Sequence, residues 1–574
     1  MITYNLIIRR CSRIIFRSYS QKTIMEPPPL KQTVIRFSGT ISPSDPLEKP
    51  VLIVGQMKNL TKIKYDLLKQ KLEPRVDQET YTAALRGIHP SSNDTVLTIH
   101  LVTLAALPFK CSRHNSPARP HSLTKIVQSH TSGVDEYIVV VCERDDVFAS
   151  ACAIARAFPL YSRKTQRNGL AQCPRAANKT ANANAIATAT ASHTVTVEFV
   201  VVGGDSAAGD VSPLSDADLA SLDAVCNGIR LAARIVDMPC NEMNVDHFLK
   251  EVESVSKELP GVSMTVIRGE ELAEKGFGGI YGVGKAALVP PALAVLSHTP
   301  PQAQQTIAWV GKGIVYDTGG LSIKGKTMMP GMKRDCGGAA AILGAFQAMV
   351  RQGFTQNLHA VFCLAENAVG PLATRPDDIH TLYSGRTVEI NNTDAEGRLV
   401  LSDGVVYARC DLAADVILDM ATLTGAQGMA TGKYHGAVLT NSQDWEETAV
   451  RAGLVSGDLL FPIPYSPELH FPEYASAVAD MKNSVADRSN ALSSCAGLFI
   501  AAHLGFEFPG SWIHIDMASP VKSGERATGY GVALLASLFG SHSKDQLLKT
   551  IGTGVFGDTF ENGNGSASKK LRRK

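Results

Sequence analysis

The sequence has no apolar run as long as a membrane span, although 44% of its 574 residues are hydrophobic. Since a transmembrane helix needs about 20 consecutive apolar residues, we expect no integral membrane protein. The sequence also lacks a dominant charge, because 56 Lys and Arg balance 54 Asp and Glu to a formal net charge of +2. A nearly neutral chain gives no reason to expect a nucleic-acid-binding field over its surface.

Three familiar site patterns are also absent. No two of the 11 cysteines form a Cys-x-x-Cys pair, so the sequence predicts scattered reduced thiols and no disulfide framework. No two of the 15 histidines form a His-x-x-x-His pair, which argues against a thermolysin-type zinc site. No Gly-x-Ser-x-Gly elbow occurs, which argues against a serine hydrolase.

The most informative stretch runs from Asn391 to Leu399. It places Asp394 and Glu396 two residues apart, directly before a glycine, Arg398 and an apolar run. Free backbone N–H groups at such a helix start, together with the helix dipole, favour an anion. A second polar cluster lies upstream and consists of Lys312, Asp317, Lys324 and Asp335. Four carboxylates and an amine are ligands that suit two divalent ions, whose four positive charges would balance the carboxylates.

The two clusters together resemble the leucyl aminopeptidase family. The family signature Asn-Thr-Asp-Ala-Glu-Gly-Arg-Leu stands unbroken from Asn392 to Leu399, and the spacings from Lys312 to Asp335 also fit. Further matches are Ala421–Ala426, Ala479–Asn483 and Trp512–Asp516. The resemblance covers roughly residues 225 to 540 and is closest to the animal "probable aminopeptidase" branch of the family.

The resemblance implies a role for each polar residue. Asp317 and Glu396 would bridge two ions, Asp335 and Lys312 would complete the tighter site, and Asp394 the more exchangeable one. Lys324 would donate to the oxyanion, and Arg398 would hold a bicarbonate that acts as general base. The substrate pocket would include Met332, Asn392, Thr422, Leu423 and Gly425.

Each role has an ordinary alternative. A single aspartate is most often a helix cap or turn residue. Lys324 could be a solvated loop lysine, Arg398 a surface ion-pair residue and Met332 a core residue. Four carboxylates at the family's spacings favour metal binding.

The implied activity is that of a metal-dependent aminopeptidase, which removes N-terminal amino acids from peptides through two-metal activation of water. We expect two divalent ions per subunit, Zn or Mn first and Mg or Co as alternatives. The resemblance also implies a homohexamer. One alternative is another dinuclear hydrolase such as a phosphoesterase, because carboxylate-bridged ions also suit phosphoryl transfer. The other is a non-catalytic, DNA-binding architectural role, for which the near-neutral charge offers little support.

Alternating strand-like and helix-like stretches predict an α/β fold with two domains. The smaller α/β N-terminal domain spans residues 33–205, with strands expected at 51–54, 96–102 and 137–142. Residues 176–191, almost only Ala, Asn and Thr, are expected to form a low-complexity loop. The larger α/β catalytic domain, residues 215–541, is expected to have a central mixed sheet that places the ligands at strand ends.

The two ends differ from the rest of the chain. Residues 1–25 hold five basic residues and no acidic one, which is typical of a mitochondrial presequence. If residues 1–19 act in this way we expect the mitochondrial matrix, and if synthesis starts at Met25 we expect the cytoplasm. Residues 542–574 are expected to form a flexible basic tail, because five of the last six residues are basic.

Overall fold

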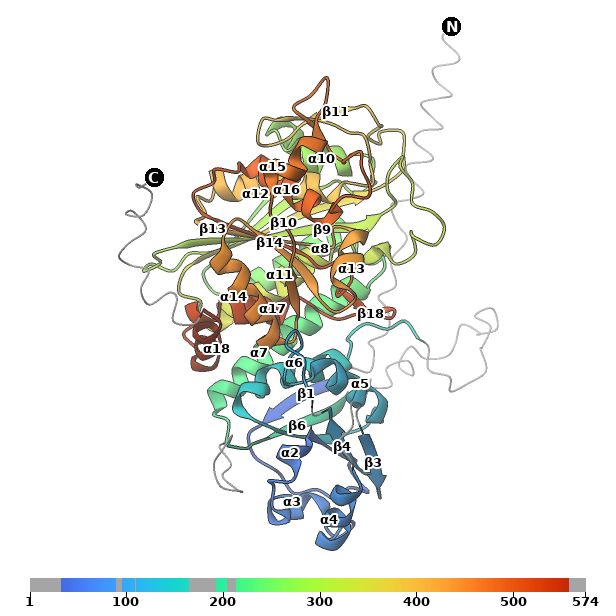
Figure 1. Ribbon diagram of the computed structural model, residues 1–574, viewed down its shortest axis with the longest axis vertical. Coiled ribbons are helices and arrows are strands. Elements are labelled where there is room, and N and C mark those ends of the chain that lie inside the picture. Colours follow the sequence, from blue (N-terminus) through green and yellow to red (C-terminus); the bar gives the residue numbers. More distant parts are fainter. Residues whose placement is uncertain (1–32, 89–94, 109, 165–191, 204–212, 557–574) are drawn as a thin grey trace, which may run out of the picture. The chain divides into compact units, whose positions relative to one another are not determined.

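The computed structural model describes residues 33–88, 95–108, 110–164, 192–203 and 213–556 (Figure 1). The expected presequence, the loop at 176–191 and the last 18 residues of the expected tail lie outside these residues. Thr33–Tyr161 and His193–Lys574 belong to one compact unit, which contains both large sheets. No helix among the described residues is both long enough and apolar enough to cross a membrane.

The first sheet has six strands in the order β1-β6-β5-β2-β4-β3. All neighbouring strands are parallel except β3 and β4, which are antiparallel. The strands are β1 (Thr33–Ser38), β2 (Val51–Gln56), β3 (Thr95–Ile99), β4 (Val102–Leu107), β5 (Glu136–Cys142) and β6 (His193–Val201). The single strand predicted at 96–102 is wrong. His100 and Leu101 take positive φ values of 47° and 63° and form the two-residue turn of a hairpin.

Helices cover both faces of this sheet. They are α2 (Met57–Leu60), α3 (Tyr65–Leu72), α4 (Gln78–Gly87), α5 (Pro120–His130) and α6 (Val147–Ala157). In β2, Leu52 and Val54 pack with α5 and α6, whereas Val51 and Ile53 pack with α2, α3 and α4. Successive side chains of a strand point to opposite faces, so a run of apolar residues indicates a strand buried on both sides.

The second sheet has eight strands in the order β15-β14-β17-β13-β9-β10-β8-β7. They are β7 (Val262–Arg268), β8 (Ala292–His298), β9 (Thr306–Asp317), β10 (Asn357–Asn367), β13 (Val416–Ala421), β14 (Gly436–Thr440), β15 (Leu460–Pro462) and β17 (Ser511–Asp516). The pairs β9–β10, β9–β13, β13–β17 and β14–β15 are parallel and the others antiparallel. The expected central mixed sheet is confirmed.

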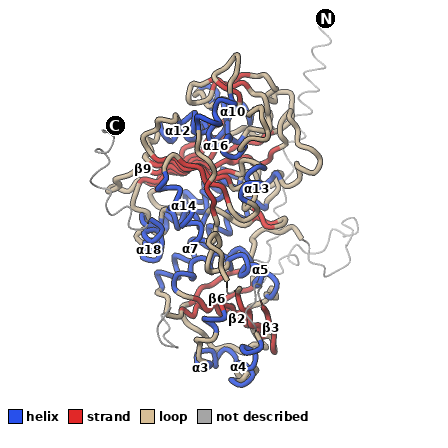
Figure 2. The backbone as a smooth tube through the Cα atoms, in the orientation of Figure 1, coloured by secondary structure: helices blue, strands red, loops and turns tan. Residues whose placement is uncertain are grey.

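This sheet lies between two layers of helices (Figure 2). One layer includes α10 (Gly278–Gly284), α12 (Gly397–Cys410) and α16 (Leu492–Leu504). The other includes α7 (Asp216–Asp237), α8 (Val245–Glu258), α11 (Gly337–Arg351), α14 (Gln443–Ser456), α17 (Val532–Leu538) and α18 (Gln546–Phe556). Helix α18 corrects the expected flexible tail, because Leu548 and Val555 are buried in the core. A tail starting at residue 557 stays a prediction.

The remaining elements are short. They are α9 (Glu270–Glu274), α13 (Gly425–Thr431), α15 (Pro467–His470), β11 (Ile379–Thr381), β12 (Thr387–Glu389), β16 (Met481–Lys482), β18 (Lys522–Ser523), β19 (Arg526–Ala527) and the 3₁₀ turns η1 (Arg144–Asp146), η4 (Met332–Arg334), η5 (Phe471–Tyr474) and η6 (Gly540–His542). Strands β11, β12 and β16 form a small sheet of their own.

One hydrophobic core joins the first sheet and its helices to the second sheet and its helices. It runs from the first sheet through α6 and α7 to α11 and the second sheet. Helices α7 and α11 meet at Gly228 and Gly344, where a Cβ on Gly228 would lie 2.5 Å from the carbonyl oxygen of Gly344. The close approach therefore requires glycine on both helices, and the two sheets share buried apolar surface.

A buried ion pair joins the same two regions. Nη2 of Arg156 in α6 lies 2.6 Å from Oδ1 of Asp458, and the two side chains are 9% and 2% exposed. Oδ2 of Asp458 accepts bonds from the backbone N–H groups of Gly531 and Leu534. Burial raises the pKa of Asp458, and Arg156 opposes that rise. The guanidinium thus supplies the countercharge for a buried carboxylate.

Arg156→Ala is expected to lower the free energy of unfolding by about 3 kcal/mol, because it leaves the Asp458 charge buried without a partner. Chemical denaturation followed by circular dichroism measures the change. The double variant Arg156→Ala/Asp458→Asn should recover most of the loss, since it removes the uncompensated charge. Equal destabilisation of the single and double variants would contradict this account.

Candidate active site

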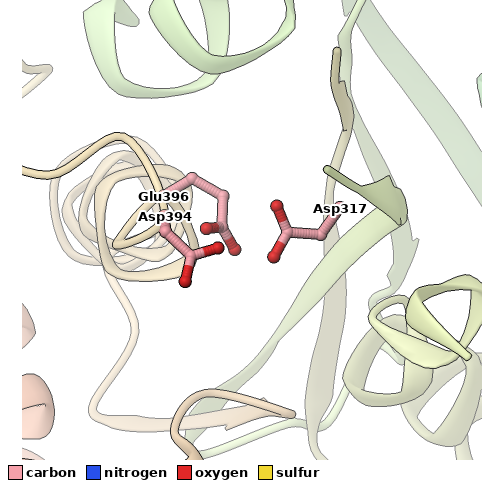
Figure 3. Close-up of side chains that lie close together, drawn as sticks. All are labelled: Asp317, Asp394 and Glu396. Atoms are coloured by element: carbon pink, nitrogen blue, oxygen red, sulfur yellow. The ribbon is translucent and has the colours of Figure 1, made fainter. Parts of the chain in front are cut away.

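Three of the carboxylates come from two segments that line the same cavity. Asp317 ends β9, and Asp394 and Glu396 lie in the loop that leads into α12. Figure 3 shows the two acidic side chains of the loop pointing toward Asp317. One ligand atom from each of the three lies within 4.8 Å of the others, which is close enough for a shared cation.

A bulge in β9 makes this convergence possible. Lys312 and Asp317 are five residues apart, so a regular strand would point them to opposite faces. Ile314 pairs with Ala365 and Tyr316 pairs with Glu366, which leaves Val315 as an extra residue. A one-residue bulge shifts the alternation by one, and both polar side chains then reach Glu396.

Lys312 is the centre of a buried network. Its Nζ lies 2.8 Å from Oδ1 of Asp335 and 2.9 Å from Oε1 of Glu396, and it donates to the carbonyl oxygen of Thr422 at 3.0 Å. The hydroxyl of Thr422 also donates to Asp335. Asp335 directly follows η4, two residues before α11 begins. The amine and the two carboxylates are therefore held in one place.

Lys324 makes a matching pair of contacts. Its Nζ lies 2.7 Å from Oδ2 of Asp317 and 2.5 Å from Oδ1 of Asp394. The side chain is 14% exposed, so it is not the solvated loop lysine of the ordinary alternative. The four carboxylates are thus arranged around two amines, and Lys324 is the more accessible of the two.

The charged groups of the site shift one another's pKa values. Burial alone would lower the pKa of Lys312, but Asp335, Glu396 and Asp317 raise it above its usual range. The pKa of Lys324 is raised in the same way, against the effect of burial. Burial raises the pKa of Glu396, with a further rise from Asp317. A lysine ligand must be neutral, so the expected binding by Lys312 requires two dications to outweigh the neighbouring carboxylates.

The residues fit a pair of divalent ions. Oδ2 of Asp335 and Oε2 of Glu396 are buried and have no hydrogen-bond partner among the described residues. An unpaired buried carboxylate oxygen costs free energy, so such atoms indicate a ligand. Carboxylate oxygens with one amine suit hard and intermediate divalent cations.

Because Gly397 has no side chain, there is room beside it for the amine of Lys312. A Cβ on Gly397 would lie 2.6 Å from Cε and 2.7 Å from Nζ of Lys312. Lys312 is only 2% exposed and makes three polar contacts, so it cannot move aside without breaking them. A glycine is therefore required here by the neighbouring amine.

Gly397→Ala is expected to lower turnover about a hundredfold, the size of effect that a displacement of about 1 Å produces at a catalytic centre. Helix content should stay unchanged. Turnover of a leucine amide, metal content and circular dichroism measure these effects. Gly554→Ala, where a Cβ meets nothing within 4 Å, is the matched control. A fully active Gly397→Ala enzyme would show that the position of Lys312 does not matter.

Arg398 lies inside the cavity, not on the surface as in its ordinary alternative. Its Nη1 donates to the hydroxyl of Tyr474 at 2.8 Å and to the carbonyl oxygen of Asn483 at 2.9 Å. Both acceptors are neutral, and Nε is buried without a partner among the described residues. The guanidinium charge can therefore attract a small anion at the start of α12.

All twelve residues predicted from the sequence line one cavity of about 1310 Å³. The five residues expected in the substrate pocket come from three segments of its wall. Met332 lies in η4, Asn392 precedes the acidic loop, and Thr422, Leu423 and Gly425 follow β13. Met332 is half-buried at the cavity, so it is not a pure core residue.

Three supporting residues were not assigned a role from the sequence. Asn367 ends β10 beside Asp317 and donates to its Oδ1 at 2.8 Å. The side chain of Asn483 accepts from the N–H groups of Asn391 and Asn392 and donates to the carbonyl oxygen of Asn392. Asp516 accepts from the N–H of Leu423, which fixes the opposite wall. Asn483 and Asp516 end two segments that match the family, Ala479–Asn483 and Trp512–Asp516, and these matches were the available signal. The local sequence carried no such signal for Asn367.

The fold and the site together define an α/β enzyme whose lysine and carboxylate side chains suit divalent cations. Residues 230–536 match the catalytic domain of the cytosol aminopeptidase family, and residues 49–167 match M17 aminopeptidase N-terminal domain 2. The chain belongs to the cytosol aminopeptidase (M17) family, whose members are metallo-exopeptidases.

Individual relatives agree with this result. The chain is 59% identical over 541 residues to the probable aminopeptidase NPEPL1 of Homo sapiens, which covers 94% of this chain and 99% of the relative. The structure of Caenorhabditis elegans leucine aminopeptidase (LAP1) is similar with a TM-score of 0.80 and 40% identity, over 90% of this chain and 100% of that one. Leucyl aminopeptidase from Trypanosoma brucei in complex with actinonin gives a TM-score of 0.74 and 35% identity, over 88% and 96%.

Proposed function

We propose that this aminopeptidase removes N-terminal amino acids from peptides by activating water at two divalent ions. The observation that carries the proposal is the convergence of Asp317, Asp394 and Glu396 at one cavity, with unpaired oxygens on Glu396 and Asp335. Family membership supports peptide chemistry over phosphoester hydrolysis or a DNA-binding role.

The proposed ligand assignment follows the contacts. Glu396 contacts Lys312 and Asp317 contacts Lys324, and as the resemblance implies the two carboxylates would be shared by both ions. Asp335 and Lys312, joined in the buried network, would hold the tighter ion. Asp394, whose side chain is 35% exposed, would hold the more exchangeable ion. Zn or Mn is the first expectation and Mg or Co the alternative, because such ligands suit all four.

When bound, the two ions would supply a water of lowered pKa and would polarise the scissile carbonyl. Lys324 reaches the centre from the more accessible side, so its ammonium can donate to the oxyanion that develops on the carbonyl oxygen. Its contacts with Asp317 and Asp394 hold the amine at that position. Arg398 would hold bicarbonate, which would supply a general base.

Peptides with free and blocked N-termini test the activity. We expect release of free amino acids from an unblocked peptide and none from its N-acetylated form, since acetylation removes the basic amine that the metal centre would bind. Amino-acid analysis after incubation with the metal-loaded protein measures both. Equal turnover of the two peptides would overturn the exopeptidase assignment, and a phosphatase panel on the same sample tests the phosphoesterase alternative.

Asp394→Ala is expected to weaken mainly the exchangeable ion. Activity at low metal concentration should fall, and excess divalent metal should restore part of it. Titration of activity against added Mn²⁺ or Zn²⁺ measures the shift, with Glu447→Ala on the exposed face of α14 as control. An Asp394→Ala enzyme with an unchanged metal titration would remove Asp394 from the ligand set.

Assembly and location extend the proposal. We expect a homohexamer, as the resemblance implies, and a stable, fully active monomer in sedimentation would contradict it. We also expect the mitochondrial matrix if residues 1–19 act as a presequence, and the cytoplasm if synthesis starts at Met25. Expression of the chain with and without residues 1–24, followed by fractionation, decides between the two.

A further inference from the structure

The cavity carries more positive charge than its metal centre requires. Besides the residues of the centre, it is lined by five basic side chains that form no ion pair with a carboxylate among the described residues. The five, which we call the basic rim, are Lys125, Arg334, Lys433, Arg488 and Lys522. The acidic residues that line the cavity are the four carboxylates of the centre and Asp458, which is paired with Arg156.

Two of these lysines come from segments that contact each other, helix α5 and the loop after α13. The rings of His121 and Tyr434 lie 4.7 Å apart. Lys125 follows His121 by four residues, about one helical turn, and Lys433 directly precedes Tyr434. Both lysines are exposed. The ring contact therefore brings two ammonium groups from distant parts of the chain to the same side of the cavity.

Two further members of the basic rim, Arg334 and Lys522, lie on segments of the cavity wall that contact each other. Nη2 of Arg334 donates to the carbonyl oxygen of Glu525 at 3.3 Å. Glu525 lies in the tight turn between β18 and β19, and Lys522 is the first residue of β18. The backbone contact thus places Arg334 and Lys522 on neighbouring segments. The positive charge is spread around the cavity wall and is not concentrated in one cation.

We propose that the basic rim binds the carboxylate of a short peptide, so that the preferred substrates are short peptides with a free C-terminus. This inference rests on the proposed function, which places the substrate's N-terminus at the metal centre. The peptide must then extend outward at about 3.3–3.6 Å per residue. A cavity of about 1310 Å³ can accommodate a peptide of a few residues. The cations of the basic rim line the same cavity and have no acidic partner among the described residues, so they can receive its C-terminal carboxylate.

The contact lies away from the reacting atoms, so it should act on binding and not on the chemical step. Losing a rim lysine should raise KM and leave kcat unchanged, which is the pattern of a binding contact shared by ground state and transition state. Because the lysines are exposed, salt should weaken the effect. These two properties distinguish a specificity role from a structural one.

Three peptides test the proposal: Leu-Gly-Gly with a free carboxylate, its C-terminal amide, and Leu-Gly-Glu amide. At low salt, kcat/KM should be about three- to tenfold higher for the acid than for the amide, because each of two exposed lysines changes an equilibrium about 1.5- to fivefold. A recovered rate with Leu-Gly-Glu amide would show that the rim binds a side-chain carboxylate as well. An unrecovered rate would show that it selects the C-terminus.

Lys125→Gln and Lys433→Gln should each reduce this preference about two- to fivefold through KM, and the double variant should nearly abolish it. Turnover of the amide should stay unchanged in all of them, which shows that the variants are folded. Lys549→Gln, an exposed lysine on α18 outside the cavity, is the matched control.

An enzyme that hydrolyses acid and amide equally would overturn the inference while leaving the proposed function intact. A preference for the acid that persists in the double variant would overturn the assignment to Lys125 and Lys433. If neither peptide is hydrolysed, the proposed function itself fails. The three results are distinct in the same set of rate measurements.

Discussion

Glu396→Ala is expected to abolish turnover and lower the metal content in the same sample. Glu396 is 2% exposed, and a carboxylate oxygen of it lies within 4.8 Å of ligand oxygens of Asp317 and Asp394. Its Oε1 forms an ion pair with Lys312, and its Oε2 has no hydrogen-bond partner among the described residues. Its removal takes a shared ligand from both proposed ions and leaves the Lys312 ammonium with a lone carboxylate partner, Asp335. Loss of metal and loss of activity should therefore occur together.

Metal analysis after dialysis, together with turnover of a leucine amide, measures both effects. Glu396→Gln keeps the volume of the side chain and removes its charge, so it should behave like the alanine variant if the carboxylate is a ligand. Glu447→Ala is the control for an exposed glutamate. Full activity at normal metal content in Glu396→Ala would mean that the acidic loop does not form the reactive centre.

Lys324→Ala should lower turnover about a hundred- to a thousandfold and leave both ions bound, by analogy with the loss of an oxyanion-hole donor. The structure explains why metal should remain. Nζ of Lys324 contacts Asp317 and Asp394, so its removal takes a positive charge away from two proposed ligands. Cation binding should then be unchanged or tighter, in contrast to Glu396→Ala.

The contrast separates the two roles. Lys326→Ala, two residues along the same loop and exposed, should keep full turnover and is the matched control. Titration with a divalent metal gives the affinity, and single-turnover kinetics give the chemical step. If Lys324→Ala loses metal while Glu396→Ala keeps it, the two assignments must be exchanged.

The sequence predicted which residues lie together at the cavity better than it predicted the residues that hold them in place. The unbroken motif from Asn392 to Leu399 indicated the proposed ligands, because carboxylates at these spacings favour a shared cation over separate cap or turn roles. The bulge at Val315 was not predictable, since strand periodicity says nothing about an extra residue in one strand. Without that bulge the i, i+5 spacing of Lys312 and Asp317 argues against a common site.

The misses in the fold have similar physical causes. Residues 96–102 are apolar enough for one strand, and only the positive φ values of His100 and Leu101 reveal the turn. His514 is fully buried and its Nδ1 lies 2.5 Å from Asp419, while its Nε2 has no partner among the described residues. Pairing partners 95 residues apart depend on sheet order, which a local pattern does not encode.

The Arg156–Asp458 pair and the shared core also determine how the chain can be divided. A fragment that starts at residue 215 would retain every proposed metal ligand. It would lose α6, so Asp458 would keep its place in the interior without a countercharge, and the apolar surface under α7 would face water. It would also lose Lys125 and with it one wall of the cavity. A boundary at residue 215 therefore does not mark a segment that folds on its own in this protein. Measurements on such a fragment would not describe the stability or the cavity of the whole chain.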